Sequence, residues 1–379
     1  MRAFVFTDKA LERQAGRFVW LSINTELRTN AAVLAKYPVQ AWPSFYVIDP
    51  ASEKVVLRYV GGATVPQLQR ILDDGARIAS AAGGAPKPDE ALATADRFFA
   101  DGKNAEAAEA YRAALKGMSP SSPSYARTVE SLLFALSASR QPEPCAAVAR
   151  EAFPNLRLSP SAANVAGSGL DCAVSLPKDV PQKTTLVEAL AADAREVLAG
   201  RRAGLAVDDV SALYETLASE REAAGDEAGK KKTLEDWAAY LDAEAAKTKT
   251  KDARAAFDAH RLTAYLELGQ PERAIPMLEA AERDFPDDYN PPARLALAYR
   301  AMKKYDEALA ASDRALARAY GPRKLVILSA RADIYAKKGD VAAARKTYED
   351  ALAWAGALPK EQVSERQIAA LKKQLETLK

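Results

Sequence analysis

Two cysteines and one histidine are the residues of this chain best suited to covalent or metal chemistry. Cys145 and Cys172 lie 27 positions apart (172 − 145 = 27), each within a segment expected to be helical. This spacing is too wide for a C-x-x-C redox pair, but helices of consecutive hairpins can bring the two sulfur atoms face to face. The pair is therefore either a disulfide, if the protein is exported, or two small buried apolar residues.

The single histidine, His260, lies in the middle of the predicted helical segment AAFDAHRLTAYLEL. No cysteine, second histidine or pair of carboxylates accompanies it at ligand spacing, so we expect a structural or surface role. One histidine leaves almost no material for a Ser-His-Asp triad or a multi-histidine site, and two cysteines exclude a four-thiolate zinc site. The sequence thus predicts no catalytic residue, no metal site and no cofactor.

The overall composition narrows the class of protein further. The 379 residues are 49% hydrophobic and carry 53 basic against 51 acidic side chains, a net charge of +2. This balance excludes a broad phosphate-binding surface, so we expect no nucleic-acid partner. No stretch approaches the ~18 consecutive apolar residues of a membrane helix, and the opening MRAFVFTDKALERQ lacks the zones of a signal peptide. As written, the chain is expected to be cytoplasmic and to have no membrane span.

The first 78 residues differ in composition from the rest of the chain. Three runs rich in β-branched and aromatic residues predict strands, and helical patterns lie around them. We expect strands at residues 18–23, 44–48 and 55–60, and helices at 2–14, 30–36 and 65–72. Strands interleaved with helices indicate a small α/β domain at residues 1–78, and the Gly- and Pro-containing stretch 79–89 predicts a linker.

An internal repeat is visible in the carboxy-terminal part. A tyrosine, and an alanine nine residues after it, return at intervals of 34 and then 36 residues. The tyrosines are Tyr265, Tyr299 and Tyr335, and the alanines are Ala274, Ala308 and Ala344. A period near 34, with an aromatic residue on the first helix and a small residue early on the second, resembles the tetratricopeptide repeat.

We expect an all-helical solenoid over residues 90–379, because strand signals disappear there and helical periodicity continues. An earlier unit is readable at residues 95–115, whereas the central units depart from the 34-residue pattern. Further helices are expected at residues 131–153, 162–174, 186–198, 210–224 and 227–246. The last helix, at residues 361–378, is expected to cover the final apolar face, because Ile368, Leu371, Leu375 and Leu378 share one side of it.

The repeat resemblance implies a protein or peptide partner. In such arrays the first helices of the units line a concave binding surface. Three residues of the predicted first helices are candidates for that surface: Arg294, Tyr299 and Arg331.

A second resemblance, over about residues 1–78, is carried by residues 36–72, KYPVQAWPSFYVIDPASEKVVLRYVGGATVPQLQRIL. The order of a V-x-x-x-P step, a strand, a hairpin, a second strand, a glycine and a final helix is similar to the carboxy-terminal half of a thioredoxin-like domain. The resemblance implies that Pro43 follows a cis peptide bond beside the substrate-binding position of that family, and that Trp42 lies at this position. The predicted fold class is therefore a multidomain one, an incomplete thioredoxin-like domain followed by a tetratricopeptide-type solenoid.

The thioredoxin-like family carries its chemistry in a C-x-x-C pair, but this chain has no cysteine before Cys145. The chain also begins inside the expected first helix, where a preceding central strand would be needed to pair the sheet. We therefore expect Met1 to be an internal methionine of a longer protein, periplasmic or exported, whose upstream segment supplies the strand. The alternative is a redox-inactive thioredoxin-like cap on a repeat protein.

Two functions follow from these patterns. The first is a non-catalytic interaction protein in which the solenoid recruits a protein or peptide partner. The second is a fragment of a thiol-disulfide oxidoreductase, an enzyme that would act through an upstream C-x-x-C. Because residues 1–379 cannot form the attacking thiolate pair, the chain as given is expected to be inactive in disulfide reduction.

Overall fold

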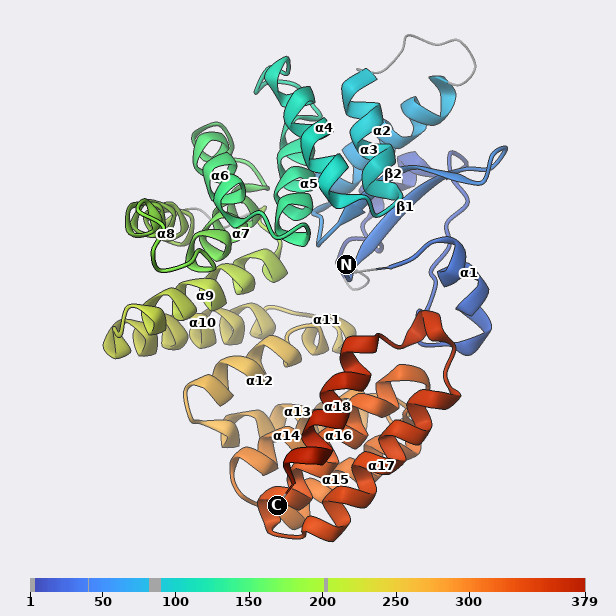
Figure 1. The fold of residues 1–379 in the computed structure, drawn as a ribbon, viewed down its shortest axis with the longest axis vertical. Helices are drawn as coiled ribbons and strands as arrows, with labels where there is room; N and C mark the ends of the chain where they lie inside the picture. The colour runs from blue at the N-terminus through green and yellow to red at the C-terminus, as the bar shows by residue number, and fades with distance from the viewer. Residues whose placement is uncertain (1–3, 40, 82–89, 201–203, 379) are drawn as a thin grey trace. The chain divides into compact units, whose positions relative to one another are not determined.

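The computed structural model describes residues 4–39, 41–81, 90–200 and 204–378 of the chain. The described residues are mostly helical, with one two-stranded antiparallel sheet. They form two compact units (Figure 1). The first comprises Met1–Phe18 and Gln40–Leu234, and the second comprises Val19–Val39 and Glu235–Lys379.

The first unit begins with a short 3-10 helix and a β-hairpin and continues as helices. Its elements are η1 (Lys9–Gln14), β1 (Ser44–Asp49), β2 (Lys54–Val60), α2 (Val65–Ala81), α3 (Glu90–Ala100), α4 (Asn104–Lys116), α5 (Tyr125–Ala138), α6 (Pro142–Leu156), α7 (Ala162–Val174), α8 (Lys183–Ala199), α9 (Val207–Ala223) and the start of α10 (Glu227–Ala246).

The hairpin forms where the sequence predicts it, because branched and aromatic residues alternate along both strands. Ser44 pairs with Val60 at its open end, and the register shifts by one residue between Val47 and Ile48. In the turn, the carboxylate of Asp49 accepts a hydrogen bond from the Ala51 backbone N–H at 3.1 Å, which fixes the reversal of the chain. The pairing thereby presents one face of the hairpin to a shared core.

That core joins the hairpin to α2. Leu57 and Tyr59 of β2 are buried against Leu68 and Ile71, which recur on one face of α2 at a spacing of three residues. The predicted helix at residues 65–72 is confirmed and extends to Ala81. The hairpin and α2 therefore form a small packed α/β element.

The predicted strand at residues 18–23 is wrong. Its backbone is irregular, and the side chains of Val19 and Leu21 are 89% and 76% exposed. A strand needs a neighbour for its N–H and C=O groups, but in the described chain β1 and β2 pair with each other and residues 19–39 belong to the second unit. The thioredoxin-like sheet is thus not seen, and the helix expected at residues 2–14 is reduced to η1 among the described residues.

The helix α3 packs on the hairpin through a buried arginine. Arg58 of β2 is 1% exposed, and its Nη1 donates to the carbonyl oxygen of Phe99 at 3.1 Å. Its guanidinium lies 4.9 Å from the Phe99 ring centroid and 5.9 Å from that of Phe134, within reach of a cation–π attraction. Burial lowers the pKa of this guanidinium. β2 is therefore tied to the first helices of the array.

Each of the helices α3–α8 packs against the next helix along the chain, and α9 packs against both α7 and α8, which places them in the helical array that the sequence predicts. The helix expected at residues 131–153 is in fact two, α5 and α6, separated by a turn in which Arg140 takes a left-handed conformation (φ 58°). Gly169 of α7 lets α6 approach closely, because a Cβ there would lie 2.4 Å from the Cβ of Ala149. Close approach of this kind explains why small residues are so frequent in the array.

The second unit contains α1 and the carboxy-terminal helices. Its elements are η2 (Arg28–Asn30), α1 (Ala31–Lys36), the rest of α10, α11 (Lys251–Ala255), α12 (Asp258–Glu267), η3 (Pro271–Ala274), α13 (Ile275–Asp284), α14 (Asn290–Ala301), α15 (Tyr305–Arg318), α16 (Gly321–Lys338), α17 (Val341–Ala357), η4 (Lys360–Gln362) and α18 (Glu365–Thr377).

The repeat predicted from tyrosine and alanine spacing corresponds to three helical hairpins, α12 with η3 and α13, α14 with α15, and α16 with α17. The turn inside each hairpin contains one left-handed residue, Gly269, Lys303 or Gly339. These residues follow the same spacing, since 303 − 269 = 34 and 339 − 303 = 36. Tyr265, Ala274, Ala308 and Ala344 are buried, as the pattern requires, whereas Tyr299 and Tyr335 are only partly buried.

The closing helix α18 covers the last repeat as predicted. Leu371 is buried in a cluster with Leu325 and Tyr348, and Ile368, Leu375 and Leu378 pack around it. A capping box formed by Ser364 and Gln367 starts the helix. The final apolar face of the solenoid is therefore shielded from water.

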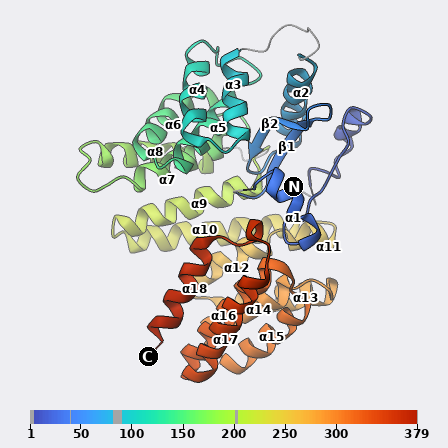
Figure 2. The ribbon, with the colours of Figure 1, turned by 45° about the vertical axis from the view of Figure 1, so that its right-hand side comes forward.

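The division into units differs from the predicted domains at 1–78 and 90–379. Residues 19–39 join the second unit, where α1 lies beside η4, the turn before α18 (Figure 1 and Figure 2). The carboxy-terminal limit of the first unit falls inside α10. Most of the predicted linker at 79–89 lies outside the described residues.

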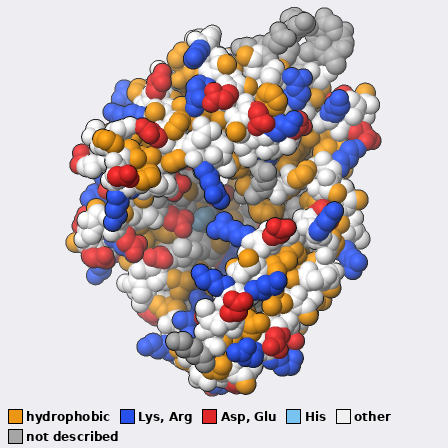
Figure 3. Space-filling view, in the orientation of Figure 1, with side chains coloured by type: hydrophobic (Ala, Val, Ile, Leu, Met, Phe, Trp, Pro, Cys, Tyr) orange, Lys and Arg blue, Asp and Glu red, His pale blue; other side chains and the backbone are white. Residues whose placement is uncertain are grey.

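The surface charge follows the balanced composition. On the face drawn in Figure 3, acidic and basic side chains are interspersed among apolar ones. Within the described ranges, no helix is long and apolar enough to cross a membrane.

Candidate functional site

The carboxylate of Glu26 is held by two consecutive repeats of the second unit. The hydroxyl of Tyr289, which precedes α14, donates to Glu26 Oε2 at 2.6 Å. Arg323, at the start of α16, places its Nε at 3.0 Å and its Nη2 at 2.8 Å from Glu26 Oε1. The side chain of Glu26 is only 15% exposed. Charge-assisted hydrogen bonds of this length are among the stronger polar contacts in proteins.

Neighbouring contacts hold the backbone next to Glu26. Gln362 Nε2 donates to the Thr25 carbonyl oxygen at 3.0 Å, and Asn24 Nδ2 donates to the Tyr320 hydroxyl at 3.0 Å. The Asn24 carboxamide oxygen also accepts from the Glu26 N–H at 2.8 Å, which sets the bend of the segment. We call residues 24–26 the latch segment.

The repeat architecture positions the residues that hold the latch segment. Tyr289 is the N-cap of α14 and Tyr320 is the N-cap of α16, so the same position of two successive units carries an aromatic residue. Their ring centroids lie 5.9 Å apart at an interplanar angle of 82°, an edge-to-face arrangement. Burial and the hydrogen bond to Glu26 raise the pKa of the Tyr289 hydroxyl, so it stays a donor at neutral pH.

Arg294 lies next to this group on α14. Burial lowers the pKa of its guanidinium, while the charges of Asp258 and Asp288 act in the opposite direction. Burial also raises the pKa of Asp258 to about 6, against the charges of Arg294, Arg261 and Arg254. Arg294 interacts electrostatically with Tyr289 and Arg323, the two residues that hold Glu26. A peptide-binding role for Arg294 stays a prediction.

The other two predicted surface residues are engaged elsewhere. Arg331 Nη1 donates to the Leu309 carbonyl oxygen at 3.1 Å and pairs with Asp313 at 2.8 Å, which ties α16 to α15. The Tyr299 hydroxyl lies 3.4 Å from Glu279 Oε1 of α13. Glu26, Tyr289 and Arg323 were not among the site residues predicted from the sequence. The aromatic residue before a first helix was a signal that could have indicated Tyr289, whereas no periodicity in the sequence points to Glu26.

Trp42 and Pro43 lie at the open end of the hairpin in the first unit. The Trp42–Pro43 peptide bond is cis, as the thioredoxin-like resemblance implies, and the Trp42 side chain is 67% exposed. The Pro43 carbonyl oxygen accepts from the Gly61 N–H at 2.9 Å. A substrate-binding role for these two residues stays a prediction.

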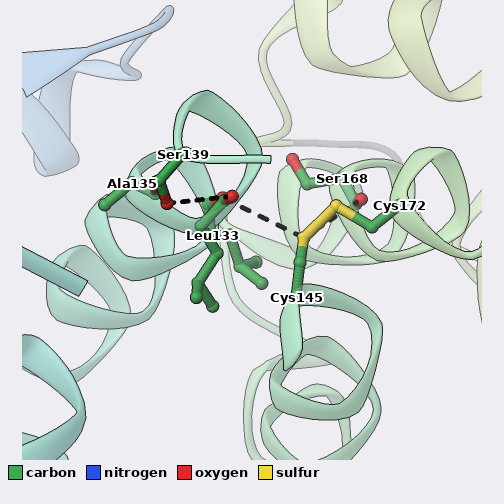
Figure 4. The surroundings of a disulfide bond; sticks show 7 residues. Leu133, Ala135, Ser139, Cys145, Ser168 and Cys172 are labelled. Atoms are coloured by element: carbon green, nitrogen blue, oxygen red, sulfur yellow. Dashed lines mark hydrogen bonds between the residues drawn. A yellow bond between two sulfur atoms is a disulfide. The ribbon is translucent and has the colours of Figure 1, made fainter. Parts of the chain in front are cut away.

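Cys145 and Cys172 are joined in a disulfide that links α6 to α7 (Figure 4). The S–S distance is 2.08 Å, the Cα atoms lie 6.0 Å apart, and both residues are buried. The Cys145 sulfur lies 3.9 Å from the Leu133 carbonyl oxygen. This is a packing contact, since a disulfide sulfur has no hydrogen to donate. The disulfide therefore closes a structural loop within the array.

A buried polar network connects α2, α3, α4 and α5 in the first unit. Arg127 donates from Nε to Asp74 at 3.0 Å and from Nη1 to Asp96 at 2.7 Å, and the Tyr111 hydroxyl also donates to Asp96 at 2.7 Å. The Ser124 hydroxyl also donates to Asp74, at 3.0 Å. Every charge in this network has a partner, which is what burial of ionic groups requires.

A second buried group surrounds Glu130 of α5. Its carboxylate accepts from the Tyr59 hydroxyl at 3.2 Å and from Gln67 Nε2 at 3.4 Å, and Gln67 also donates to Ser161 at 3.2 Å. Burial raises the pKa of Glu130 to about 7. The adjoining cavity has a volume of about 30 Å³, room for about two water molecules. We interpret this group as structural, because a substrate does not fit there.

Metal binding finds no support in the described ranges, where no group of three or more His, Cys, Asp or Glu residues could hold an ion. His260 instead lies with its ring centroid 6.5 Å from that of the buried Trp237. This position fits the structural role expected for the histidine.

Comparison with known proteins supports the repeats. Residues 289–355 match the family model described as tetratricopeptide repeat. No curated protein matches the chain. Among solved structures, a tetratricopeptide repeat protein from Parabacteroides merdae is similar at 11% identity and a TM-score of 0.47, covering 76% of this chain and 97% of that one.

The TPR2AB domain of yeast Sti1, in a complex with pHSP90, is similar at 13% identity and a TM-score of 0.27. It covers 76% of this chain and 98% of that one. Both structural likenesses are too distant to carry a functional argument. The match at residues 289–355 and the three hairpins described above show that this mostly helical chain contains tetratricopeptide repeats.

Proposed function

We propose that the protein is a protein–protein interaction scaffold whose tetratricopeptide repeats bind a peptide segment of a partner. One observation carries this proposal. Side chains from the starts of two successive repeats already hold the carboxylate of a short non-helical segment, the latch segment, and Gln362 of η4 holds its backbone. Repeat arrays present residues from neighbouring units on one surface, which suits them to an extended peptide.

The amino-terminal part plays no redox role in this proposal. A redox-inactive thioredoxin-like domain is the finer hypothesis, supported by the hairpin and by the following α2. The chain has no cysteine before Cys145, and both of its cysteines are engaged in the disulfide. We therefore expect no acceleration of insulin-disulfide reduction by the chain as given, measured by turbidity with dithiothreitol. Turnover comparable to that of a thioredoxin would contradict the proposal.

A display selection tests peptide binding directly. A phage library of random twelve-residue peptides is selected on the immobilised full chain and, in parallel, on a Glu26→Gln variant. We expect enriched peptides whose binding weakens at least fivefold when Arg294 or Arg323 is changed to Ala. Arg366→Ala is the matched control, because Arg366 is an exposed arginine at the start of α18.

Two results would overturn the proposed function. One is that neither the wild type nor the variant enriches any peptide over an empty support. The other is that enriched peptides bind equally well to the Arg294→Ala, Arg323→Ala and Arg366→Ala variants.

A further inference from the structure

The site around Glu26 is built for one carboxylate. Three donor groups, from Tyr289 and Arg323, converge on its two oxygens at 2.6 to 3.0 Å. The Arg323 guanidinium also lies 5.9 Å from the Tyr289 ring centroid, so the tyrosine helps to fix the direction of the cation. A planar guanidinium held in this way recognises a carboxylate better than a flexible ammonium group would.

The site also recognises the backbone beside that carboxylate. Gln362 donates to the Thr25 carbonyl oxygen, a group that every peptide has. Gly321 lies so close to the segment that a Cβ at this position would be 2.1 Å from the Glu26 carbonyl oxygen. These contacts fit an acidic residue within a peptide chain rather than a small free acid.

The latch segment consists of three polar residues, Asn24, Thr25 and Glu26. Val19 and Leu21, which precede it, are exposed, and so are Ile23 and Leu27 on its two sides. A segment with little buried apolar surface opens at a low free-energy cost compared with a packed helix. The latch segment can therefore leave its site while the repeats stay folded.

The chain nevertheless keeps the latch segment near its site. Downstream, α1 buries Leu34 and packs beside η4. Only four residues separate Glu26 from the start of α1. Such a short tether gives an effective concentration on the order of millimolar, so a weak internal ligand competes well with a free peptide.

We propose that the latch segment, Asn24–Glu26, is an internal ligand that occupies the carboxylate-binding site of the repeats, and that a partner peptide with an acidic residue binds by displacing it. The inference rests on the proposed function and names its partner class. It makes the resident segment an autoinhibitory contact: the partner must bind tightly enough to outcompete the tethered glutamate.

The test uses a fluorescein-labelled peptide with the sequence of residues 22–30, SINTELRTN, and a second peptide in which its glutamate is glutamine. Binding to full-length proteins is measured by fluorescence anisotropy at low salt. We expect the Glu26→Gln variant to bind the first peptide at least fivefold more tightly than the wild type does, because the internal competitor is weakened. Asn24→Ala should change the affinity in the same direction.

Recognition by the site is tested in the Glu26→Gln background. Adding Arg323→Ala, or using the glutamine peptide, should weaken binding at least tenfold, whereas adding Arg366→Ala should leave it unchanged. Circular dichroism checks that each variant is folded. Glu349→Gln, at an exposed glutamate of α17, is the matched control for Glu26→Gln and should bind as the wild type does.

The outcomes separate the two proposals. If the wild type, Glu26→Gln and Asn24→Ala proteins bind the labelled peptide with equal affinity, the internal-ligand proposal is overturned, even where display-selected peptides still bind. Failure of the labelled peptide to bind any variant, while selected peptides bind in an Arg323-dependent way, would also overturn it and leave the scaffold function intact. Failure of both kinds of peptide would overturn the two proposals together.

Discussion

At the residue scale, Glu130 shows how burial changes the chemistry of a side chain. Tyr59, Gln67 and Arg127 surround it, and the carboxyl of Asp209 interacts with it. Burial raises its pKa from the ordinary value of 4.5 to about 7, so the folded protein keeps this carboxyl protonated in mild acid. Burial and the charge of Glu130 also raise the pKa of Asp209.

This shift predicts a specific pH dependence of stability. Between pH 4.5 and 7 the folded state holds a proton on Glu130 that the unfolded state has released, so the free energy of unfolding falls as pH rises through this range. Glu130→Gln should make that slope less steep by about 1.4 kcal/mol per pH unit. Urea unfolding at pH 5, 6, 7 and 8 measures it. Glu151→Gln, at an exposed glutamate of α6, should keep the wild-type slope; an unchanged slope in Glu130→Gln would contradict the assignment.

At the element scale, Arg127 joins three helices that are distant in the sequence. It bridges Asp74 of α2 and Asp96 of α3 from its place on α5, and its side chain is 6% exposed. Arg127→Ala leaves the buried carboxylate of Asp96 without its cation and leaves Asp74 with Arg77 alone. We therefore expect a loss of about 3–5 kcal/mol in the free energy of unfolding. Arg157→Ala removes an ion pair with Glu196 in which both side chains are more than half exposed, and it should cost about 1 kcal/mol or less. Similar losses in the two variants, measured by urea unfolding, would show that the bridge does not hold the helices together.

The disulfide constrains another pair of helices, α6 and α7. It closes a loop across 27 positions, and loop-closure entropy predicts that it adds about 3–4 kcal/mol to the free energy of unfolding. A Cys145→Ala/Cys172→Ala variant should therefore melt at a lower temperature than the oxidised wild type. Calorimetry with and without dithiothreitol measures this: reductant should lower the melting temperature of the wild type and leave that of the variant unchanged. If dithiothreitol leaves the melting temperature of the wild type unchanged, the two cysteines contribute to stability only as buried apolar groups.

At the scale of the whole molecule, local patterns were predictable and distant contacts were not. The spacing of Tyr265, Tyr299 and Tyr335 predicted the hairpins because repeat packing involves near neighbours in the sequence. Glu26 of the latch segment contacts Tyr289 and Arg323, which lie 263 and 297 positions later in the chain. No periodicity in the sequence encodes such a contact. The β-rich run at residues 18–23 suggested a strand from composition alone. Composition cannot supply the pairing neighbour that a strand needs.

Gly321 offers a test of this long-range contact in the intact chain. Its left-handed backbone (φ 54°) and its closeness to the Glu26 carbonyl leave no room for a side chain. Gly321→Ala should therefore destabilise the docked segment by about 1–2 kcal/mol, without removing any contact made by a side chain. Because proteolysis follows the population of the open form, trypsin should cut after the exposed Arg28 roughly 5–30 times faster.

Mass spectrometry of the fragment that ends at Arg28 measures the rate of this cleavage. Gly356→Ala in α17 is the matched control, because nothing lies within 4 Å of a Cβ at that position, and its cleavage rate should equal that of the wild type. Equal rates in Gly321→Ala and Gly356→Ala would mean that the segment is not seated against α16 in solution. A selective increase in Gly321→Ala would show that a residue close to the carboxy-terminal repeats controls the exposure of a segment almost 300 positions before it, which is the coupling that displacement by a partner requires.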